Sequence, residues 1–253
     1  MYSEERQQEI LRRLSRNGRV VTSELVAEWG VATETVRKDL IALARLGLLE
    51  RTHGGALPKQ HRGFELEAPT HQDRHVEEKK RIARTAATLL APHDTVFIGD
   101  GSTTGFVPGC VPFDLELRVV TNSLLVEQGF LEHPSVTVIS TGGIIRRAPQ
   151  SYVGPWPIRA ISELSVDTLL LGVGGISADR GLSATDALDA QVKTAMLGVA
   201  RRVVVLADES KLGVDSFHRF GGWEHVDTLI TSSGAAEAVL APFRDVVREI
   251  LVV

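Results

Sequence analysis

Five short segments of this chain concentrate the residue types that bind oxyanions. Glycines let backbone N–H groups approach a ligand closely, hydroxyls donate to phosphate oxygens, and lysine supplies a compact positive charge. The segments are residues 99–104, 121–123, 141–143 with Arg146 nearby, 172–175 and 208–211. Each follows a run of apolar and β-branched residues that is typical of a strand. The five segments together predict a binding site for a phosphorylated ligand.

Single segments have ordinary alternative explanations. Residues 99–104 alone also fit a tight strand-to-helix turn, and Lys211 alone fits a surface lysine, although its place just after Asp208 favours a site. The candidate effector-binding residues are Asp100, Gly101, Ser102, Thr103, Thr104, Thr121, Asn122, Gly142, Gly143, Arg146, Gly174, Gly175, Lys193 and Lys211.

The elements that must position these residues follow from the hydrophobic pattern. Candidate strands are residues 95–98, 117–120, 136–140, 168–173, 203–206, 228–230 and 248–252. Candidate helices are one that ends near residues 91–92 and others near 123–132, 157–164, 188–200 and 235–241. Alternating strands and helices predict an α/β domain with a mostly parallel sheet covered on both faces. Ligands bind at the carboxyl ends of such strands, where the five segments meet.

The first part of the chain has a different pattern. Ile10, Leu11 and Leu14 have helical spacing, and a second helix follows with Thr22 as its expected N-cap. Val20 and Val21 are expected to form only a link between them. After Gly30 a third helix is predicted over residues 33–46, with an apolar stripe of Val36, Leu40 and Leu43. Two short helices around a glycine turn predict a helix-turn-helix, whose last helix enters the major groove of DNA.

Residues 48–57 predict a hairpin, which makes this part a winged helix. Arginine and lysine reach guanine or phosphate, and threonine serves either. The candidate DNA-binding residues are Thr22, Thr33, Thr35, Arg37, Lys38, Arg51 and His53. The alternative is a three-helix packing module with a charged, solvated face.

The charge distribution agrees with a nucleic-acid-binding part at the N-terminus. The 253 residues carry 28 basic and 32 acidic side chains, yet residues 1–62 have eleven basic and eight acidic side chains, a net charge of +3. The remaining residues have a net charge of −7, from seventeen basic and twenty-four acidic side chains. A basic end on an acidic body is typical of polyanion binding, although so small a surplus also arises by ordinary fluctuation.

The composition indicates a folded protein of two domains. We expect a winged helix-turn-helix domain at residues 1–57, a linker at 58–80 and an α/β domain at 81–253. Neither a signal peptide nor an apolar run long enough to cross a bilayer is evident, so a cytoplasmic location without membrane contact is expected. The single cysteine, Cys110, excludes an internal disulfide. His53, His61, His71 and His75 lack zinc-site spacing, so neither a metal nor a cofactor is expected.

In the first part of the chain, residues 29–40 read WGVATETVRKDL, and residues 51–56 read RTHGGA. This part of the sequence resembles the DeoR family of bacterial repressors. Family members typically read L-G-V-S-x-x-T-[IV]-R-[RK]-D-L and then R-x-H-G-G-A. One departure is Ala32, which stands where the family has a serine that caps the recognition helix. Loss of that cap costs about 1 kcal/mol unless Thr33 replaces it.

The resemblance extends to the C-terminal effector domain of the same family and covers nearly the whole chain. It rests on residues 78–83, 101–104, 120–123, 142–143 and 207–211. The family often has Asp-Ser before Gly-Ser-Thr, whereas this chain has Gly99-Asp100, which shifts the carboxylate by one position. The resemblance implies a fold related to ribose-5-phosphate isomerase and a sensor for a phosphorylated sugar.

The same resemblance raises the possibility of catalysis. An approximate alignment places residues 171–175 over the isomerases' D-G-A-D-E and Val192-Lys193 over their glutamate-lysine pair. The acid–base groups are therefore replaced. Asp186 and Asp189 lie near enough to reach a ligand, but neither is at a position where the proton transfer is expected.

The leading hypothesis is a transcriptional regulator, most often a repressor in this family, which binds operator DNA and a phosphorylated sugar. Two alternatives stay open. One is a sugar-phosphate isomerase with an accessory DNA-binding head, and the other is a DNA-binding protein whose body only oligomerises. Paired operator half-sites favour at least a dimer.

Overall fold

A computed structural model describes residues 3–17, 19–45, 48–52, 54–58 and 75–253 of the chain. The chain divides into two compact units. The described residues of the first unit, 3–58, are called the head below, and residues 75–253 are called the body.

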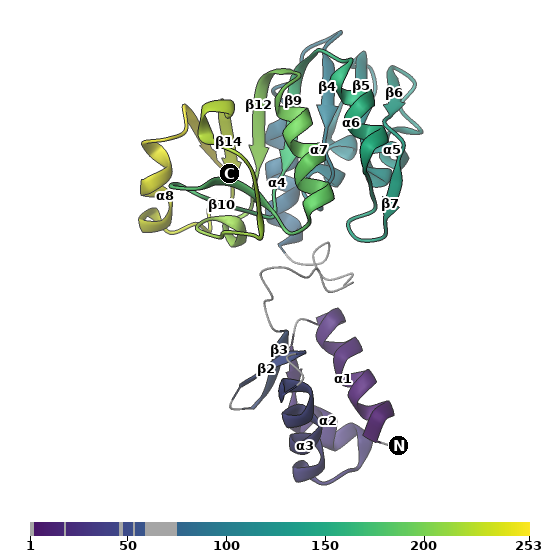
Figure 1. Cartoon of the computed structure of the whole chain (residues 1–253), viewed down its shortest axis with the longest axis vertical. Coiled ribbons are helices and arrows are strands. Elements are labelled where there is room, and N and C mark those ends of the chain that lie inside the picture. Colours follow the sequence, from purple (N-terminus) through teal and green to yellow (C-terminus); the bar gives the residue numbers. More distant parts are fainter. Residues whose placement is uncertain (1–2, 18, 46–47, 53, 59–74) are drawn as a thin grey trace. The chain divides into compact units, whose positions relative to one another are not determined.

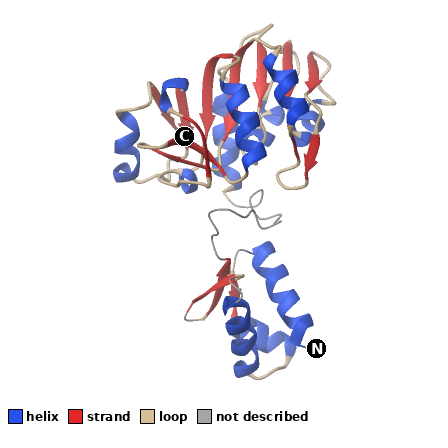
Figure 2. Cartoon of the chain, viewed as in Figure 1, coloured by secondary structure: helices blue, strands red, loops and turns tan. Residues whose placement is uncertain are grey.

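The head combines helices with a small antiparallel sheet (Figure 2). Its described elements are α1 (Ser3–Asn17), β1 (Val20–Val21), α2 (Thr22–Trp29), α3 (Thr33–Arg45), β2 (Leu49–Thr52) and β3 (Gly55–Pro58). The predicted stripe of α3, Val36, Leu40 and Leu43, is buried against Ile10 and Leu25 from the other two helices. Burying apolar surface on one side of each short helix stabilises the unit and leaves the opposite side of α3 facing water.

Two local predictions for the head are wrong. Val20 and Val21 are not a simple link, because they pair with Ala56 and Gly55 of β3. Thr22 is the first residue of α2 and not its cap; Val21 holds the cap position, and no side chain caps this helix. Two paired residues carry no periodic signal, so only the distant β3 decides that this segment is a strand.

The predicted wing is present as the β2–β3 hairpin. Leu49 pairs with Pro58 and Thr52 with Gly55, so the chain reverses between Thr52 and Gly55. A Cβ added to Gly55 would lie 1.8 Å from the carbonyl oxygen of Val20, so the close approach of β1 requires glycine there. The N–H of Thr22 donates to the carbonyl of Gly54 at 2.8 Å, which ties the wing to the start of α2.

The body is built on a seven-stranded, entirely parallel sheet (Figure 1). Its spatial order is β15-β14-β12-β9-β4-β5-β6. The strands are β4 (Thr95–Ile98), β5 (Leu117–Thr121), β6 (Val136–Ser140), β9 (Val166–Gly172), β12 (Ala200–Leu206), β14 (Thr228–Thr231) and β15 (Glu249–Val252). All seven predicted strands are therefore confirmed, with small differences at their ends.

Helices cover both faces of this sheet, as predicted. They are α4 (Val76–Ala87), α5 (Leu124–Phe130), α6 (Pro155–Ser162), α7 (Ala187–Leu197) and α8 (Glu237–Arg244). Alternate strand residues point to opposite faces. Ile98 and Leu170 are buried in the cluster that includes α4 and α5, whereas Phe97, Leu169 and Leu171 are buried with α6, α7 and α8. The central strands are therefore buried on both sides.

Several short elements of the body were not predicted. β7 (Ile144–Arg146) and β8 (Ser151–Val153) form a hairpin, and β10 (Gly175–Ser177), β11 (Gly181–Ala184) and β13 (His218–Gly221) form a small antiparallel sheet. Each of these five strands has only three or four residues, and β10, β11 and β13 each contain a glycine. Such short strands give no hydrophobic pattern from which they could be predicted. In addition, α4 begins at Val76, inside the segment expected to be linker.

Candidate functional site

The exposed side of α3 presents the residues predicted to contact DNA. Thr33, Arg37 and Lys38 are exposed and Thr35 is half-buried. The guanidinium of Arg37 lies 3.9 Å from the carboxylate of Glu34, an exposed and therefore weak pair that does not prevent it from reaching a ligand.

The remaining DNA-binding candidates lie outside α3. Arg51 is exposed on β2 of the wing, and Thr22 is half-buried at the start of α2. His53 lies outside the described residues. The structure thus gathers four of the seven candidates on one helix, while Arg51 and Thr22 lie on β2 and α2.

Asp39 holds this helix in place and was missed as a functional position. Its carboxylate is buried and accepts hydrogen bonds from Arg6 Nε at 2.7 Å and from Gln7 Nε2 at 3.2 Å, both on α1. The sequence signal that could have revealed this pair is the position of Asp39 directly beside Leu40, a residue of the apolar stripe. The pair fixes the orientation of α3 relative to α1, and with it the direction of Arg37 and Lys38.

The order of strands in the body reverses at one place on the sheet, where a ligand-binding crevice is expected. β4 and β9 are neighbours, and the chain continues outward from them in opposite directions, to β5 and β6 on one side and to β12, β14 and β15 on the other. Such a reversal leaves a ligand-binding crevice at the carboxyl ends of the two strands. Residues 99–104 follow β4 and residues 173–175 follow β9, so two of the predicted segments flank it.

Asp100 is buried at the end of β4 and is joined to the neighbouring loop by hydrogen bonds. Its N–H donates to Asn122 Oδ1 at 3.0 Å, and Asn122 Nδ2 donates to Asp100 Oδ1 at 3.4 Å. Asn122 Nδ2 also donates to the carbonyl of Tyr152 in β8 at 3.2 Å. Asn122 therefore connects the ends of β4 and β5 with the β7–β8 hairpin.

Some of the predicted hydroxyl groups are already used within the fold. Thr121 Oγ1 donates to the carbonyl of Ile98 at 2.6 Å and accepts from the N–H of Ser123 at 3.0 Å. Thr104 Oγ1 donates to the carbonyl of Gly101 at 3.1 Å. Thr103 precedes the short 3₁₀ turn of residues 104–106, and its side chain does not cap that turn. Thr103 and the half-buried Ser102 are therefore better placed to bind a ligand than Thr104 and Thr121.

Lys193 on α7 lies between two buried carboxylates. Its Nζ is 3.1 Å from Asp189 Oδ2 and 3.6 Å from Asp100 Oδ1. Arg146, at the end of β7, has its Nη1 3.9 Å from Asp189 Oδ2. Three predicted residues thus meet in one cluster, which we call the buried quartet: Asp100, Arg146, Asp189 and Lys193. Asp189 is absent from the predicted set, although its four-residue spacing from Lys193 on a helix was a signal of this pair.

Burial and neighbouring charges shift the pKa values of Asp189 and Lys193. Removal from water raises the pKa of Asp189 to about 7; the charge of Asp100 adds to this effect, and Lys193 and Arg146 oppose it. Burial by itself lowers the pKa of Lys193, but the adjacent carboxylates of Asp100 and Asp189 outweigh it, so the pKa is raised. Lys193 therefore stays protonated at neutral pH, whereas Asp189 titrates there.

The glycines of the predicted segments have two different roles. A Cβ at Gly172 would lie 2.7 Å from the carbonyl oxygen of Asp100, and one at Gly175 would lie 2.4 Å from that of Val214. One at Gly174 would lie 3.1 Å from the carbonyl oxygen of Ser183. These glycines permit close packing of the backbone. Gly142 and Gly143 have φ angles of +59° and +130°, which explains glycine there by conformation.

Lys211 lies in the loop after β12, on the β9 side of the crevice. The carboxylate of Asp208 accepts from the N–H of Ser210 at 3.0 Å and so shapes this loop. Leu212 bridges to Ile176 of β10, which holds the loop beside the segment that follows β9. Lys211 itself is half-buried.

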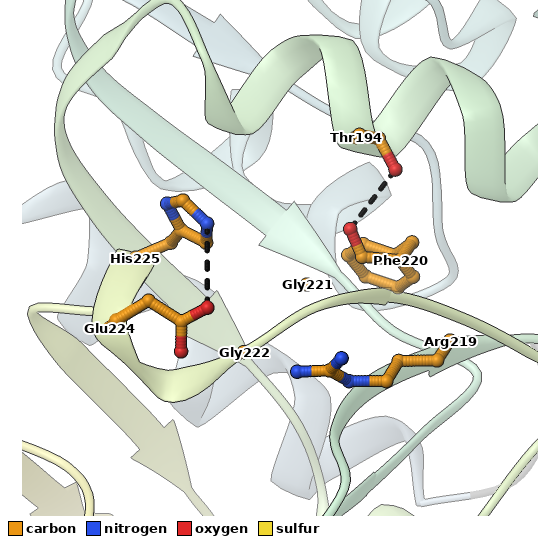
Figure 3. A pocket seen from close by; sticks show the side chains of 7 residues that line it. All are labelled: Thr194, Arg219, Phe220, Gly221, Gly222, Glu224 and His225. Carbon is orange, nitrogen blue, oxygen red and sulfur yellow. Dashed lines mark hydrogen bonds and ion pairs between the residues drawn. The ribbon is translucent and has the colours of Figure 1, made fainter.

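A pocket of about 370 Å³ lies beside α7, where the ring of Phe220 is 6.0 Å from Lys193 Nζ (Figure 3). It is lined by Thr194, Arg219, Phe220, Gly221, Gly222, Glu224 and His225. The hydroxyl of Thr194, on α7, donates to the carbonyl of Phe220 at 3.0 Å, and both residues line the pocket. None of the predicted effector-binding residues lines it, so this pocket does not replace the crevice as the candidate site.

Two further findings concern the described residues only. They contain no cluster of three or more histidine, cysteine, aspartate or glutamate side chains that could hold a metal ion. Of the four histidines considered above, His75 is described, and its Nδ1 lies 3.1 Å from Glu209 Oε1; the other three lie outside the described residues. None of the helices in this part of the chain has the length and hydropathy to span a bilayer.

Asp186, the other acid considered for catalysis, has a structural role. It caps α7 by accepting hydrogen bonds from the N–H groups of Leu188 at 2.9 Å and Asp189 at 3.0 Å. Its cap fixes the first turn of the helix that carries Asp189 and Lys193.

Comparisons with known proteins agree with both units. Residues 6–61 match the DeoR-like helix-turn-helix domain, and residues 74–233 match the DeoR C terminal sensor domain. The glycerol-3-phosphate regulon repressor of Escherichia coli K12 is 31% identical over 248 residues, 97% of each chain. The transcriptional repressor GlcR of Bacillus subtilis strain 168 is 33% identical over 235 residues, 91% of this chain and 89% of that protein.

A solved structure is also similar to part of the chain. The ribose 5-phosphate isomerase A of Methanocaldococcus jannaschii is 17% identical, with a TM-score of 0.38 over 53% of this chain and 52% of that chain.

Proposed function

The chain belongs to the DeoR family of transcriptional regulators, and we propose that it is a repressor of carbohydrate genes that releases its operator when a phosphorylated sugar binds the body. The observation that carries this proposal is the presence, in one chain, of an exposed basic face on α3 and of polar loops after β4 and β9, where the order of the strands reverses. Both relatives are named as repressors, which supports the direction of regulation, and one of them is named for the glycerol-3-phosphate regulon.

In this proposal α3 enters the major groove. Arg37 and Lys38 reach guanine edges or phosphates, and Thr33 and Thr35 lie at the start of the same helix. Arg51 of the wing and Thr22 contact the DNA backbone, as does His53, whose place in the structure is outside the described residues. A dimer or larger oligomer would present two heads to paired half-sites.

The effector would bind at the crevice. Ser102, Thr103 and the backbone N–H groups of the loop after β4 would hold the phosphate, and Lys211 would supply positive charge from the loop after β12. Gly142, Gly143 and Arg146 would close the side next to β5 and β6. The ligand must prefer one arrangement of the heads, because equal affinity for two states shifts neither.

A binding experiment tests the proposal directly. DNA that the protein selects from a random-sequence pool serves as the operator, and gel shifts measure its affinity with and without sugar phosphates. We expect specific binding that one of the sugar phosphates abolishes. Selection without sequence preference contradicts the operator-binding role. Specific binding that no sugar phosphate changes, together with no heat of binding in calorimetry, would favour a body that only oligomerises.

One observation favours a second candidate, a sugar-phosphate isomerase. Asp189, with its pKa raised to about 7 beside a buried lysine, resembles a general acid–base group. We propose binding without catalysis because the residues at the end of β9 are Leu171, Gly172, Val173 and Gly174, which carry no acid–base group. NMR of the protein with ribose 5-phosphate, glucosamine 6-phosphate, fructose 6-phosphate and tagatose 6-phosphate decides this. Conversion that is abolished by Asp189→Asn would establish the enzyme instead.

A further inference from the structure

We propose that the contact between His75 and Glu209 is a link through which a ligand at the loop after β12 redirects the chain that leads to the head. The inference rests on the proposed function and specifies how binding in the body reaches the DNA-binding head. It follows from the contact itself, from the backbone conformation of His75 and from the place of Glu209 in the loop that carries Lys211.

The two side chains of the link belong to distant parts of the sequence. His75 directly precedes α4, and Glu209 begins the 3₁₀ turn of residues 209–211 after β12. His75 Nδ1 lies 3.1 Å from Glu209 Oε1. The side chains are 37% and 25% exposed, so water screens the contact in part and its strength is modest. A modest contact suits a link that a ligand has to be able to break.

Glu209 is held within the loop that carries Lys211. The N–H of Lys211 donates to the carbonyl of Asp208 at 3.0 Å, and the N–H of Leu212 donates to that of Glu209 at 3.3 Å. The N–H of Glu209 donates to Ser232 Oγ at 3.0 Å, and this hydroxyl donates in turn to Glu209 Oε2. Glu209 and Lys211 therefore share one closed turn. A ligand that moves Lys211 displaces the partner of His75 as well.

The backbone of His75 is in a conformation from which one rotation changes the direction of the chain. Its φ is +54°, in the left-handed region, which costs free energy for a residue with a Cβ atom. Such conformations persist where surrounding contacts hold them, and the contact with Glu209 is of this kind. The carbonyl of His75 accepts from the N–H of Lys79 at 2.9 Å, which fixes the side that enters α4. Because φ is the rotation about the N–Cα bond, a return to negative φ leaves α4 in place and re-aims the residues before His75.

The head is joined covalently to His75 through residues 59–74, which lie outside the described residues. A change of direction at His75 is therefore passed along the chain toward α3. A ligand that binds with different affinity when the link is intact and when it is broken shifts the balance between the two directions. One partly exposed pair can change this balance about threefold.

A second histidine–glutamate pair of the body provides a matched control. His93 Nδ1 lies 3.2 Å from Glu116 Oε2, and the φ of His93 is +69°. This pair lies just before β4 and β5, at the amino ends of the strands, whereas the polar loops lie at the carboxyl ends. It therefore shares the chemistry and the backbone conformation of the proposed link but not its position.

The first test is a double-mutant cycle on the full chain. Gel shifts with the selected operator measure the concentration of ribose 5-phosphate, fructose 6-phosphate, glucosamine 6-phosphate or tagatose 6-phosphate that releases half of the DNA. We expect His75→Ala to change this concentration at least threefold in the wild type. It should have no effect beside Glu209→Ala, where the contact is already absent, and His93→Ala should change nothing.

Three results of this cycle overturn the link. The first is a wild-type concentration that His75→Ala leaves unchanged. The second is an effect of His75→Ala that persists undiminished beside Glu209→Ala. The third is an equal effect of His93→Ala, which would mean that the position of the pair is irrelevant.

Hydrogen exchange without DNA or ligand separates this inference from the proposed function. His75→Ala should speed exchange in residues 209–212, and Glu209→Ala should speed it in residues 76–80, because each segment loses its distant partner. If each segment is unaffected by the variant in the other, the link is overturned. If both segments respond but no sugar phosphate releases the operator from the wild type, the proposed function fails and the link between the segments stands.

Discussion

The ammonium of Lys193 lies 3.1 Å from the carboxylate of Asp189, one turn earlier on α7. Because Asp100 at the end of β4 is only 3.6 Å away, the same lysine joins the helix to the centre of the sheet. A lysine expected to bind a ligand's phosphate is therefore already engaged by two carboxylates. Its charge opposes the rise in the pKa of Asp189, and the positive charge for a phosphate must come from elsewhere, such as Lys211.

The exposed arginine of α3 gives the first prediction. Arg37→Ala should weaken binding to the selected operator by about 1–3 kcal/mol if Arg37 reads a base, with little effect on scrambled DNA. If it contacts only phosphate, binding to both DNAs should fall about equally. Gel shifts measure both, with Arg159→Ala on the exposed side of α6 as control. Unchanged binding to both DNAs would show that α3 is not the recognition helix.

The buried carboxylate of the same helix gives the second. Asp39→Ala removes a buried carboxylate that accepts hydrogen bonds from Arg6 and Gln7, so the head should lose about 3 kcal/mol of stability. Hydrogen exchange followed by mass spectrometry should show faster exchange throughout α3, while the body is unaffected. Glu34→Ala, at an exposed position of α3, should leave exchange unchanged. Equal exchange in the two variants would mean that the Asp39–Arg6 pair does not stabilise the head.

The third prediction concerns the phosphate end of the proposed effector site. Thr103→Val keeps the shape of the side chain but removes its hydroxyl, and Lys211→Ala removes a charge. Each should lower the affinity for the tightest sugar phosphate about tenfold, the equivalent of one hydrogen bond to a charged group. Operator binding without ligand should persist. Thr137→Val, on the exposed side of β6, is the control. Release of DNA at the wild-type ligand concentration in both variants would place the effector elsewhere.

The fourth prediction follows from the pKa of Asp189. Its pKa is raised from 3.8 to about 7 in the folded state, so between these values the folded protein binds more protons than the unfolded one. Asp189 therefore favours the folded body most below pH 4, and this contribution is lost as the pH rises through 7. Thermal unfolding of the wild type should show that loss, and Asp189→Asn should have a flatter profile. Parallel profiles for the two proteins would contradict the raised pKa.

The sequence by itself determined the elements that depend on local pattern. The stripe of Val36, Leu40 and Leu43 has the period of a helix, and each buried strand of the main sheet is a short apolar run followed by glycine or polar residues. Hydrophobic periodicity indicates which face of a helix or strand is buried, but it does not indicate which other element packs against that face. The class of the fold and the edge of the sheet that carries the polar loops were therefore predictable, as was the basic face of α3.

Only the tertiary structure decided which polar groups meet. Asp100 and Lys193 are far apart in sequence, and nothing local indicates that β4 and α7 bring them together or that Asp189 joins them. The same holds for β1, which exists because β3 packs against it at Gly55. Side-chain partners depend on strand order and packing between distant elements, which hydrophobic patterning does not encode. From the sequence, the hydroxyls of Thr103, Thr104 and Thr121 were equally good candidates for binding a ligand. The structure shows that those of Thr104 and Thr121 are already hydrogen-bonded to backbone carbonyls, whereas Thr103 does not cap the turn that follows it.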